Sequence, residues 1–367
     1  MFNHKFRTTG SIIALVIIIS VLLIGCQSPT TVSTTTVEST LATTTETTAT
    51  ETTTSAPAPT TNLNPLNPLT GEPLINASAE GLRPVAIMIN NHRDGVPQIG
   101  IGSADLLYEM LVEGGITRMM AVFADVTTIP ELGTIRSSRH DYVDLAGGLD
   151  AIYVHVGGSY AANDQMSRQG TPHIDLHVYP DAYWRDQAWI KERGYEHSVK
   201  TTGERLQAAI VQSKYTTTVR AGQKPAFNFR SSEDFVAAAG EAAIAVTVPY
   251  SSYCTATFDY DATSRLYSKG EFGGPQIDLA TGNAIKFTNV ILIKTKVYQF
   301  DAVLKETDLI SGKGYYISGG QWQPINWAKG KTADSFVFTD ESGSELKVNV
   351  GKSYIGILPL DRKITFK

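Results

Sequence analysis

The pattern of apolar and polar positions divides this chain into four segments. A basic start with Lys5 and Arg7 precedes an apolar run at 11–24, and residues 27–62 have no apolar periodicity. Buried runs separated by glycine turns begin near residue 63, and a period of two dominates after residue 233. We therefore expect a leader at 1–25, a lipidated cysteine with a tether at 26–62, and two folded domains at 63–232 and 233–367.

The apolar run has the features of a secretory signal peptide. It is shorter than the roughly 17–25 residues of a membrane-spanning helix, and it has a basic flank. It ends at Leu23-Ile24-Gly25-Cys26, where a small residue precedes the cysteine. We expect cleavage before Cys26 and lipidation of its thiol by acyl chains such as palmitate, two of which give stable anchoring. The expected location is the extracellular face of the cell membrane, and the expected membrane contact is this lipid.

Residues 27–62 are rich in threonine, with scattered glutamates and prolines. Such a segment cannot bury enough apolar surface to offset the entropy lost on ordering. We expect a flexible tether that holds the folded part away from the membrane.

The first folded domain contains a predicted hairpin that carries charge. Two apolar segments flank Gly114-Gly115, a two-residue turn signal. With that turn, Arg118 would lie opposite Leu111 and diagonal to both Glu109 and Glu113 on one sheet face. This face is either a solvated surface with ordinary ion pairs or a functional charged patch.

A second motif suggests an anion pocket. Arg136 and Arg139 lie at an expected helix start, and an apolar strand at 150–156 runs into Gly157-Gly158-Ser159 before another helix. A strand, a glycine pair and a helix start leave backbone N–H groups pointing to one place, which suits an anion. The alternative is a tight turn with structural arginines.

Evidence for catalysis or metal binding is weaker. His155 together with Glu109 or Glu113 could serve as a general acid–base pair, but the sequence contains none of the common hydrolase motifs. The alternating set His173, Asp175 and His177 has no further histidine or cysteine nearby in sequence. We expect no metal and no cofactor, and we leave enzymatic activity undecided while favouring a non-enzyme.

The second domain is predicted to be mainly antiparallel β, as a barrel or sandwich, because short strands alternate with turn signals. The first domain mixes strands with helices, so the expected fold class is α+β. If Cys26 is lipidated, Cys254 has no disulfide partner in the chain and is expected to be a buried apolar residue.

Several motifs together resemble the YerB-like bacterial lipoproteins, an uncharacterised family with an N-terminal and a C-terminal domain. The matching stretches run from 67–71 to about residue 359, and the most specific are 83–86, 112–118, 136–139, 150–155 with 157–159, 289–291, Gly312 with Gly314, and Trp327 with Lys329. The chain departs from the family pattern at His140, where a proline is expected, and at Glu196-His197-Ser198, which approximates Pro-His-Asn. The resemblance implies lipoprotein topology and an α+β first domain, without an activity.

The formal net charge of −5 argues against general affinity for nucleic acid. The function we expect is a binding or regulatory module at the cell wall that recognises an anionic wall component or a partner protein. The alternatives are a cell-wall hydrolase or transferase that uses Glu109 or Glu113 with His155, and a solute-binding lipoprotein.

Overall fold

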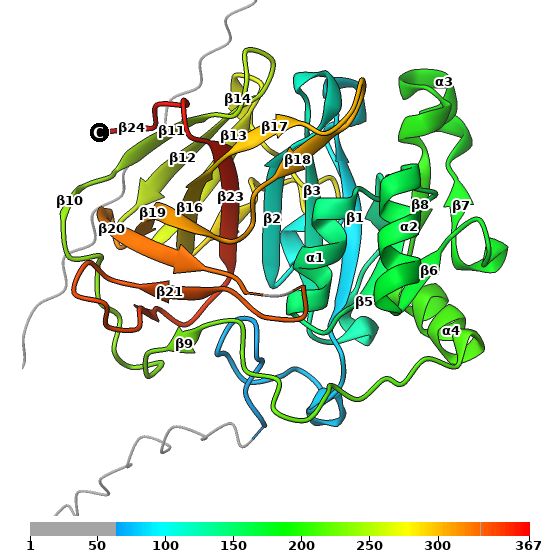
Figure 1. The fold of residues 1–367 in the computed structure, drawn as a ribbon, viewed down its shortest axis with the longest axis horizontal. Helices are drawn as coiled ribbons and strands as arrows, with labels where there is room; N and C mark the ends of the chain where they lie inside the picture. The colour runs from blue at the N-terminus through cyan, green and yellow to red at the C-terminus, as the bar shows by residue number, and fades with distance from the viewer. Residues whose placement is uncertain (1–63, 331) are drawn as a thin grey trace, which may run out of the picture. The chain divides into compact units, whose positions relative to one another are not determined.

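A computed structural model describes residues 64–330 and 332–367 (Figure 1). The expected leader, the tether and Cys26 lie outside the described residues. Within the described ranges we find no helix with the length and hydropathy that crossing a membrane requires.

The largest feature is an 11-stranded mixed sheet. In spatial order its strands are β10 (Glu241–Ala242), β20 (Gln321–Ala328), β19 (Ser311–Ser318), β16 (Asn289–Thr295), β23 (Ser353–Pro359), β2 (Leu106–Leu111), β3 (Thr117–Phe123), β1 (Val85–Asn91), β5 (Ile152–His155) and β6 (His173–Asp175), with β21 (Val337–Thr339) paired to β20.

A six-stranded sheet contains β14 (Gly274–Pro275), β13 (Leu266–Glu271), β12 (Thr255–Asp261), β11 (Ala245–Pro249), β24 (Thr365–Phe366) and β15 (Lys286–Phe287). Smaller sheets are formed by β17 (Val297–Gln299) with β18 (Lys305–Thr307), by β9 (Asn228–Phe229) with β22 (Lys347–Val348), and by β4 (Leu132–Gly133), β8 (Val199–Thr201) and β7 (Trp184–Arg185). The α-helices of the described residues are α1 (His140–Gly148), α2 (Tyr160–Gln169), α3 (Gln187–Arg193) and α4 (Gly203–Ser213).

The large sheet joins the two segments that we expected as domains. Strand β23, from the C-terminal segment, pairs in parallel with β2 of the N-terminal segment and also with β16. The fold is α+β with a β-rich C-terminal part, as predicted. Six other C-terminal strands form the six-stranded sheet, in which β11, β12 and β13 are antiparallel neighbours.

The large sheet has a hydrophobic core on each face. One core contains Ile87 and Ile89 of β1, residues of the six-stranded sheet such as Phe258, and Leu206 of α4. The other contains Met88 with residues of α1 and α2, and these helices lie in front of the sheet in Figure 1. All seven residues of β1 are buried, as expected for a strand covered on both faces.

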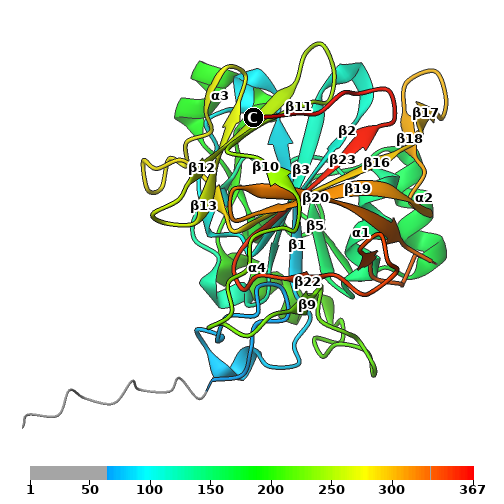
Figure 2. The same cartoon turned by 90° about the vertical axis from the view of Figure 1, so that its left-hand side faces the viewer.

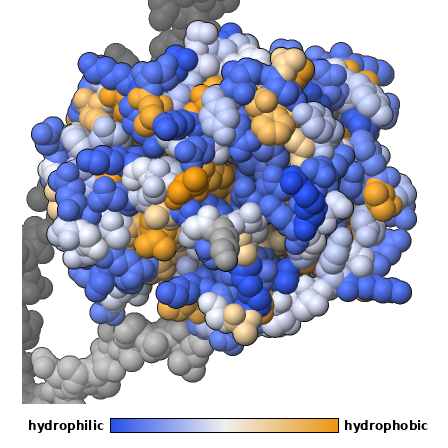
Figure 3. Space-filling view, in the orientation of Figure 1, coloured by the Kyte–Doolittle hydropathy of each residue, from blue (hydrophilic) through white to orange (hydrophobic). Residues whose placement is uncertain are grey.

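The outer surface of the helical layer is polar. In Figure 3 the right-hand part of the molecule, where Figure 1 shows the helices, is mainly hydrophilic. Apolar side chains gather nearer the centre and left of the same face, and exposed apolar residues in the C-terminal part include Ile310 and Val337. Seen from the side, β12 and β13 lie on one side of the large sheet, and α1 and α2 lie on the other (Figure 2).

The β2–β3 hairpin has a different register from the one predicted. Its connection contains a short 3-10 helix at Glu113–Gly115, in which Gly114 and Gly115 both have positive φ. Leu111 consequently pairs with Thr117, and Arg118 lies opposite Met110. A shift of one residue moves a side chain to the other face of a sheet. The predicted shared face of Glu109 and Arg118 is therefore wrong.

Candidate anion-binding site

Strands β1, β5 and β6 are parallel, so their carboxyl ends meet at one edge of the large sheet. The segment after β4 crosses this edge. The backbone N–H of Arg136 donates to Met88 of β1 (3.0 Å), and the carbonyl of Arg136 accepts from Val156 after β5 (3.2 Å). Edges of this kind commonly hold ligands in open sheets with parallel strands. Arg136 is thereby fixed between the ends of two strands.

Two guanidinium groups hold Glu113 beside Arg136. Its carboxylate accepts from Arg118 Nη2 (3.2 Å), from Arg139 Nε (2.8 Å) and from Arg139 Nη2. Burial opposes ionisation of Glu113, but the hydrogen bond and charges of Arg139 and Arg118 outweigh it and lower its pKa to about 2. Glu113 is therefore a carboxylate at neutral pH and cannot store a proton for catalysis.

Arg118 is only 3% exposed. Its Nη1 donates to the carbonyl of Ser137 (2.6 Å), while its buried Nε has no hydrogen-bond partner among the described residues. Burial and the nearby Arg139 charge lower its pKa to about 9, although Glu113 opposes the shift. The guanidinium is still charged at neutral pH and carries an unused donor.

Arg136 adds a further positive charge to the site. Its Nη1 donates to the backbone carbonyl of Glu196 (3.3 Å), and within the described ranges it forms no ion pair. Burial lowers the pKa of Arg136, the charge of Glu196 opposes this shift, and the positive charge of Arg139 acts in the same direction as burial. Three guanidinium groups thus converge where Glu113 and the exposed Glu196 supply two negative charges.

His197 completes the site from the short helix at Tyr195–His197. Asn90 lies directly opposite Arg118 in the β1–β3 register, and its amide nitrogen is 2.6 Å from His197 Nδ1. The amide oxygen of Asn90 accepts from the backbone N–H of His92 (3.1 Å), which fixes the orientation of the amide group. Nδ1 of His197 therefore accepts a hydrogen bond, and the proton of the neutral ring lies on Nε2.

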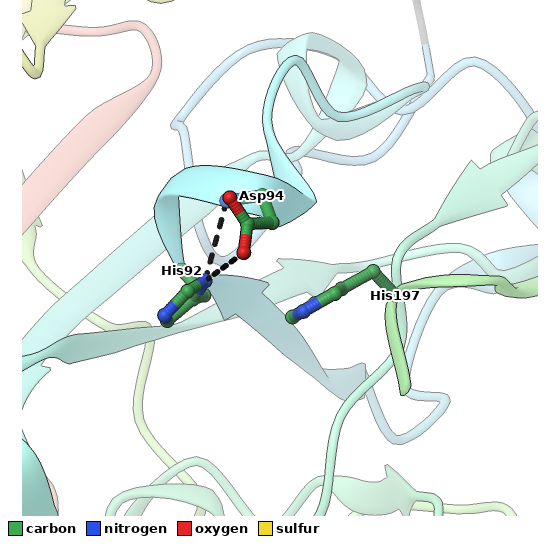
Figure 4. A group of neighbouring side chains, drawn as sticks. All are labelled: His92, Asp94 and His197. Carbon is green, nitrogen blue, oxygen red and sulfur yellow. Dashed lines mark hydrogen bonds and ion pairs between the residues drawn. The ribbon is translucent and has the colours of Figure 1, made fainter. Parts of the chain in front are cut away.

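The same ring belongs to a group that resembles a metal site (Figure 4). Ligand atoms of His92, Asp94 and His197 lie within 4.8 Å of one another, and the two imidazole rings stack with centroids 5.3 Å apart. A metal at Nε2 would require a lone pair there, whereas the hydrogen bond from Asn90 favours the N–H form. In this arrangement His197 offers a donor, not a metal ligand.

These residues form the arginine–histidine cluster, which we define as Arg118, Arg136, Arg139, Glu113 and His197. Burial, followed by the charge of Arg136, lowers the pKa of His197, so the ring is neutral at pH 7 and still presents an N–H. The cluster combines excess positive charge with directed donors, which is the chemistry that binds anions.

The glycine turn expected to contribute to this pocket uses the N–H groups of Gly157 and Ser159 within the fold. Gly157 N donates to the carboxylate of Asp175 (2.9 Å), and Ser159 N donates to the carbonyl of Ser138 (3.2 Å). The hydroxyl of Ser159 accepts from the N–H of Ala162 and caps α2. Gly158 pairs with Ser138 in a parallel bridge. In the predicted anion pocket, the N–H groups of Gly157 and Ser159 are therefore not available to an anion, because both donate to other groups of the protein.

The proposed catalytic pair is not assembled. His155 is buried beside the ring of Tyr153, which belongs to the core of the helical face, and its Nδ1 contacts the carbonyl of Gly157 (2.9 Å). Burial lowers its pKa to about 4. Glu109 lies on the opposite face of the sheet, where it contacts Tyr354, and Glu113 is occupied by arginines. The structure thus separates His155 from both carboxylates.

Two cavities in the described part of the chain lie away from this site. One of about 590 Å³ contains Asp278 and Lys352 in its lining, and one of about 880 Å³ contains Phe227 and Phe338. Neither is lined by a member of the arginine–histidine cluster. The sequence analysis identified Arg118, Arg136 and Arg139 as candidate site residues. It missed Asn90, and it noted His197 only as part of a segment that resembles Pro-His-Asn.

Comparison with known proteins agrees with this architecture. Residues 69–216 match a family model described as the N-terminal domain of a protein of unknown function, DUF3048, and residues 244–355 match the corresponding C-terminal domain. The chain is 28% identical over 284 residues to the putative lipoprotein YerB of Bacillus subtilis (strain 168), covering 76% of this chain and 81% of that protein.

A crystal structure of YerB protein from Bacillus subtilis superposes with a TM-score of 0.72 at 26% identity, covering 82% of this chain and 100% of that one. Both family models match in chain order, and together they span most of the described residues. This chain therefore belongs to the two-domain, YerB-like DUF3048 family.

Proposed function

We propose that this protein is a lipid-anchored envelope protein whose folded body binds an anionic cell-wall component at the arginine–histidine cluster. The observation that carries the proposal is Arg136, which is held half-buried by backbone hydrogen bonds to β1 and to the end of β5 and forms no ion pair among the described residues. The exposed carboxylate of Glu196 offsets only part of its charge. Arg118 adds a buried Nε that lacks a hydrogen-bond partner.

The anchoring half of the proposal rests on the leader-like sequence and on the relative. The matched Bacillus protein is named a putative lipoprotein, and Cys26 follows a sequence typical of lipoprotein processing. We place the lipid on Cys26 and the folded body on the extracellular side of the membrane. In that location, wall polymers bearing phosphate or carboxylate groups are the abundant anions.

Electrostatics favour an anionic ligand over a neutral one. Half-buried guanidinium groups interact with anions more strongly than exposed ones, since water screens them less. Arginine also binds carboxylate and phosphate through two parallel hydrogen bonds. An anion beside Arg136 would balance the surplus positive charge that Glu113 and Glu196 leave.

Calorimetry with soluble wall fragments tests this function. We expect the chain to bind a phosphate-bearing teichoic polymer or a carboxylate-bearing muropeptide, and Arg136→Ala to weaken that binding at least tenfold with little change in thermal stability. Arg168→Ala is the matched control, because Arg168 is exposed on α2 and pairs with Asp164 (2.9 Å). Equal binding by wild type and Arg136→Ala, or no binding of either fragment, would refute the proposal.

A further inference from the structure

The other face of the β2–β3 hairpin contains a buried amine between two acids. Lys269 of β13 places Nζ 3.1 Å from Oε2 of Glu109 on β2, and Nζ also contacts the carboxylate of Glu271. The side chains of Lys269 and Glu109 are 0% exposed and that of Glu271 is 2% exposed. This amine–acid cluster, which we define as Lys269, Glu109 and Glu271, connects the large sheet with the six-stranded sheet.

The charges of the amine–acid cluster do not balance if both acids are ionised. Two carboxylates face one ammonium, and a buried surplus charge is costly. Burial raises the pKa of Glu109, and the charge of Glu271 raises it further, although Lys269 opposes the shift. With a proton on Glu109, one carboxylate faces one ammonium and the buried charges balance. The site then contains a carboxylic acid, an amine and a second carboxylate that can take a proton, all shielded from water.

Two neighbouring hydroxyl groups hold the carboxyl group of Glu109 in place for attack by Nζ of Lys269. The hydroxyl of Tyr354 donates to Oε2 of Glu109 (2.8 Å), and that of Thr117 donates to Oε1 (2.7 Å). Both hydrogen bonds draw electron density away from the carboxyl carbon. Reacting groups that are held in contact have high effective concentrations, and the dry surroundings favour loss of water from the pair.

We propose that Lys269 and Glu109 join in an intramolecular isopeptide bond. Glu271 takes a proton from the ammonium of Lys269, and the freed Nζ lone pair attacks Cδ of Glu109. The C–OH bond of the acid then breaks, and the hydroxyl leaves as water with a second proton from the nitrogen, relayed by Glu271. One amide and one water form, Glu271 ends protonated, and no oxidant or cofactor is consumed.

Such a bond would supply a covalent link that cysteine chemistry cannot provide here. The chain has only two cysteines, and Cys254 is free and buried. An amide between β2 and β13 would lock together strands that come from the two family segments. It would also resist reduction, and it would hold the sheets together outside the cell, where the proposed location puts this protein.

Nζ of Lys269 also lies beside Gln276 and Glu271, and reaction with either side chain would give a different product. Nζ of Lys269 is also 2.7 Å from Oε1 of Gln276, where bond formation would release ammonia instead of water. A bond from Lys269 to Glu271 would remain within one tryptic peptide, because trypsin cuts after Arg265 and Lys286. Glu109 lies in a separate tryptic peptide, at 94–118.

Mass spectrometry of the full-length chain, denatured and digested with trypsin, decides between these products. We expect peptide 94–118 joined to peptide 266–286, uncut at Lys269, with a combined mass lower by one water. Recovery of 94–118 alone, with cleavage after Lys269, would overturn the proposal, and so would a loss of ammonia assigned to Gln276. This readout needs no variant, so a folding defect cannot obscure it.

A variant and an internal comparison test the role of Glu271. Glu271→Gln removes the proton acceptor while keeping the size of the side chain, and we expect it to leave the two peptides separate. Lys200 provides the comparison, because its Nζ is 2.7 Å from Asp186, whose carboxylate reaches solvent. We expect peptides containing Lys200 and Asp186 to stay unjoined. Joining in Glu271→Gln at the wild-type level would exclude the proposed proton transfer.

Discussion

Glu109 and Arg118 leave the β2–β3 hairpin on opposite faces, although their strands are direct neighbours. Glu109 enters the core between the two sheets and contacts Lys269. Arg118 faces the helical layer and binds Glu113. The hairpin thus supplies one residue to a dry structural cluster and another to the candidate anion site.

The first prediction concerns the acid dependence of stability. Because Glu113 has a folded pKa of about 2, below its ordinary value of 4.5, it stabilises the fold above pH 4.5, and this contribution is lost as the pH falls towards 2. Arg139→Ala should cost ~1–3 kcal/mol at pH 7 and reduce that acid-induced loss. Urea unfolding at pH 7 and pH 3 measures both effects.

Arg168→Ala is the control for this measurement, because the Arg168–Asp164 pair is solvent-exposed and such pairs contribute little. An unchanged acid dependence in Arg139→Ala would show that Arg139 does not set the pKa of Glu113.

The second prediction concerns the pH dependence of anion binding. The charged and titratable groups near His197 are Arg136, Glu196, His92 and Asp94. The pKa of His197 lies below 6.5 in the free protein, and a bound anion should raise it. Affinity should therefore increase as the pH falls from 7 through 6.5 and lower. Calorimetry in buffers of different ionisation enthalpy would detect the accompanying proton uptake.

His197→Gln should bind the anion with a flatter pH profile, because glutamine donates a hydrogen bond but does not titrate. His177→Gln serves as the control, since His177 is exposed and outside the cluster. If both variants keep the wild-type pH profile, His197 does not contact the ligand.

The third prediction is a large loss of stability on removing the buried amine. Lys269→Met leaves Glu109 and Glu271 facing each other without a cation, and breaking a buried pair in this way typically costs about 3–5 kcal/mol. Chemical denaturation measures the loss. The double variant Lys269→Met/Glu271→Gln should recover part of it, because Glu271, the acid taken as ionised, is then replaced by a neutral amide. A double variant less stable than Lys269→Met would contradict this account.

The fourth prediction is a gain of stability at Asp141. Burial, and then the charge of Glu306, raise the pKa of Asp141 well above its ordinary value. A carboxyl with a raised folded pKa destabilises the fold above its unfolded pKa, and this cost disappears as the pH falls. Asp141→Asn keeps an acceptor for Thr307 N–H and should raise stability at pH 7 by ~1 kcal/mol. Thermal unfolding at pH 7 would detect the gain, which should shrink at pH 4.

The fifth prediction tests the anchor. Cys26→Ala should prevent lipidation and move the protein from the membrane fraction to the soluble or secreted fraction. Fractionation followed by immunoblotting measures this change, and Cys254→Ala is the control because that thiol is buried in the folded body. A Cys26→Ala protein that stays with the membrane would disprove anchoring through this residue.

The sequence by itself predicted the α+β class, most segments of regular structure and the family. Strand β1 illustrates the reason, since an apolar run with Arg83-Pro84 before it encodes a buried strand locally. Ser159 capping α2 is another local signal. Burial patterns and caps depend on residues close in the chain, so they can be recognised without the fold.

Tertiary structure decided which charges meet. The register of the β2–β3 hairpin depends on a short 3-10 helix at Gly114 that no pattern of apolar residues encodes, and a shift of one residue separates Glu109 from Arg118. Asn90 and His197 are 107 positions apart, and Glu109 and Lys269 come from different family segments. Sequence spacing does not constrain such contacts, because they form only when segments distant in the chain pack against one another.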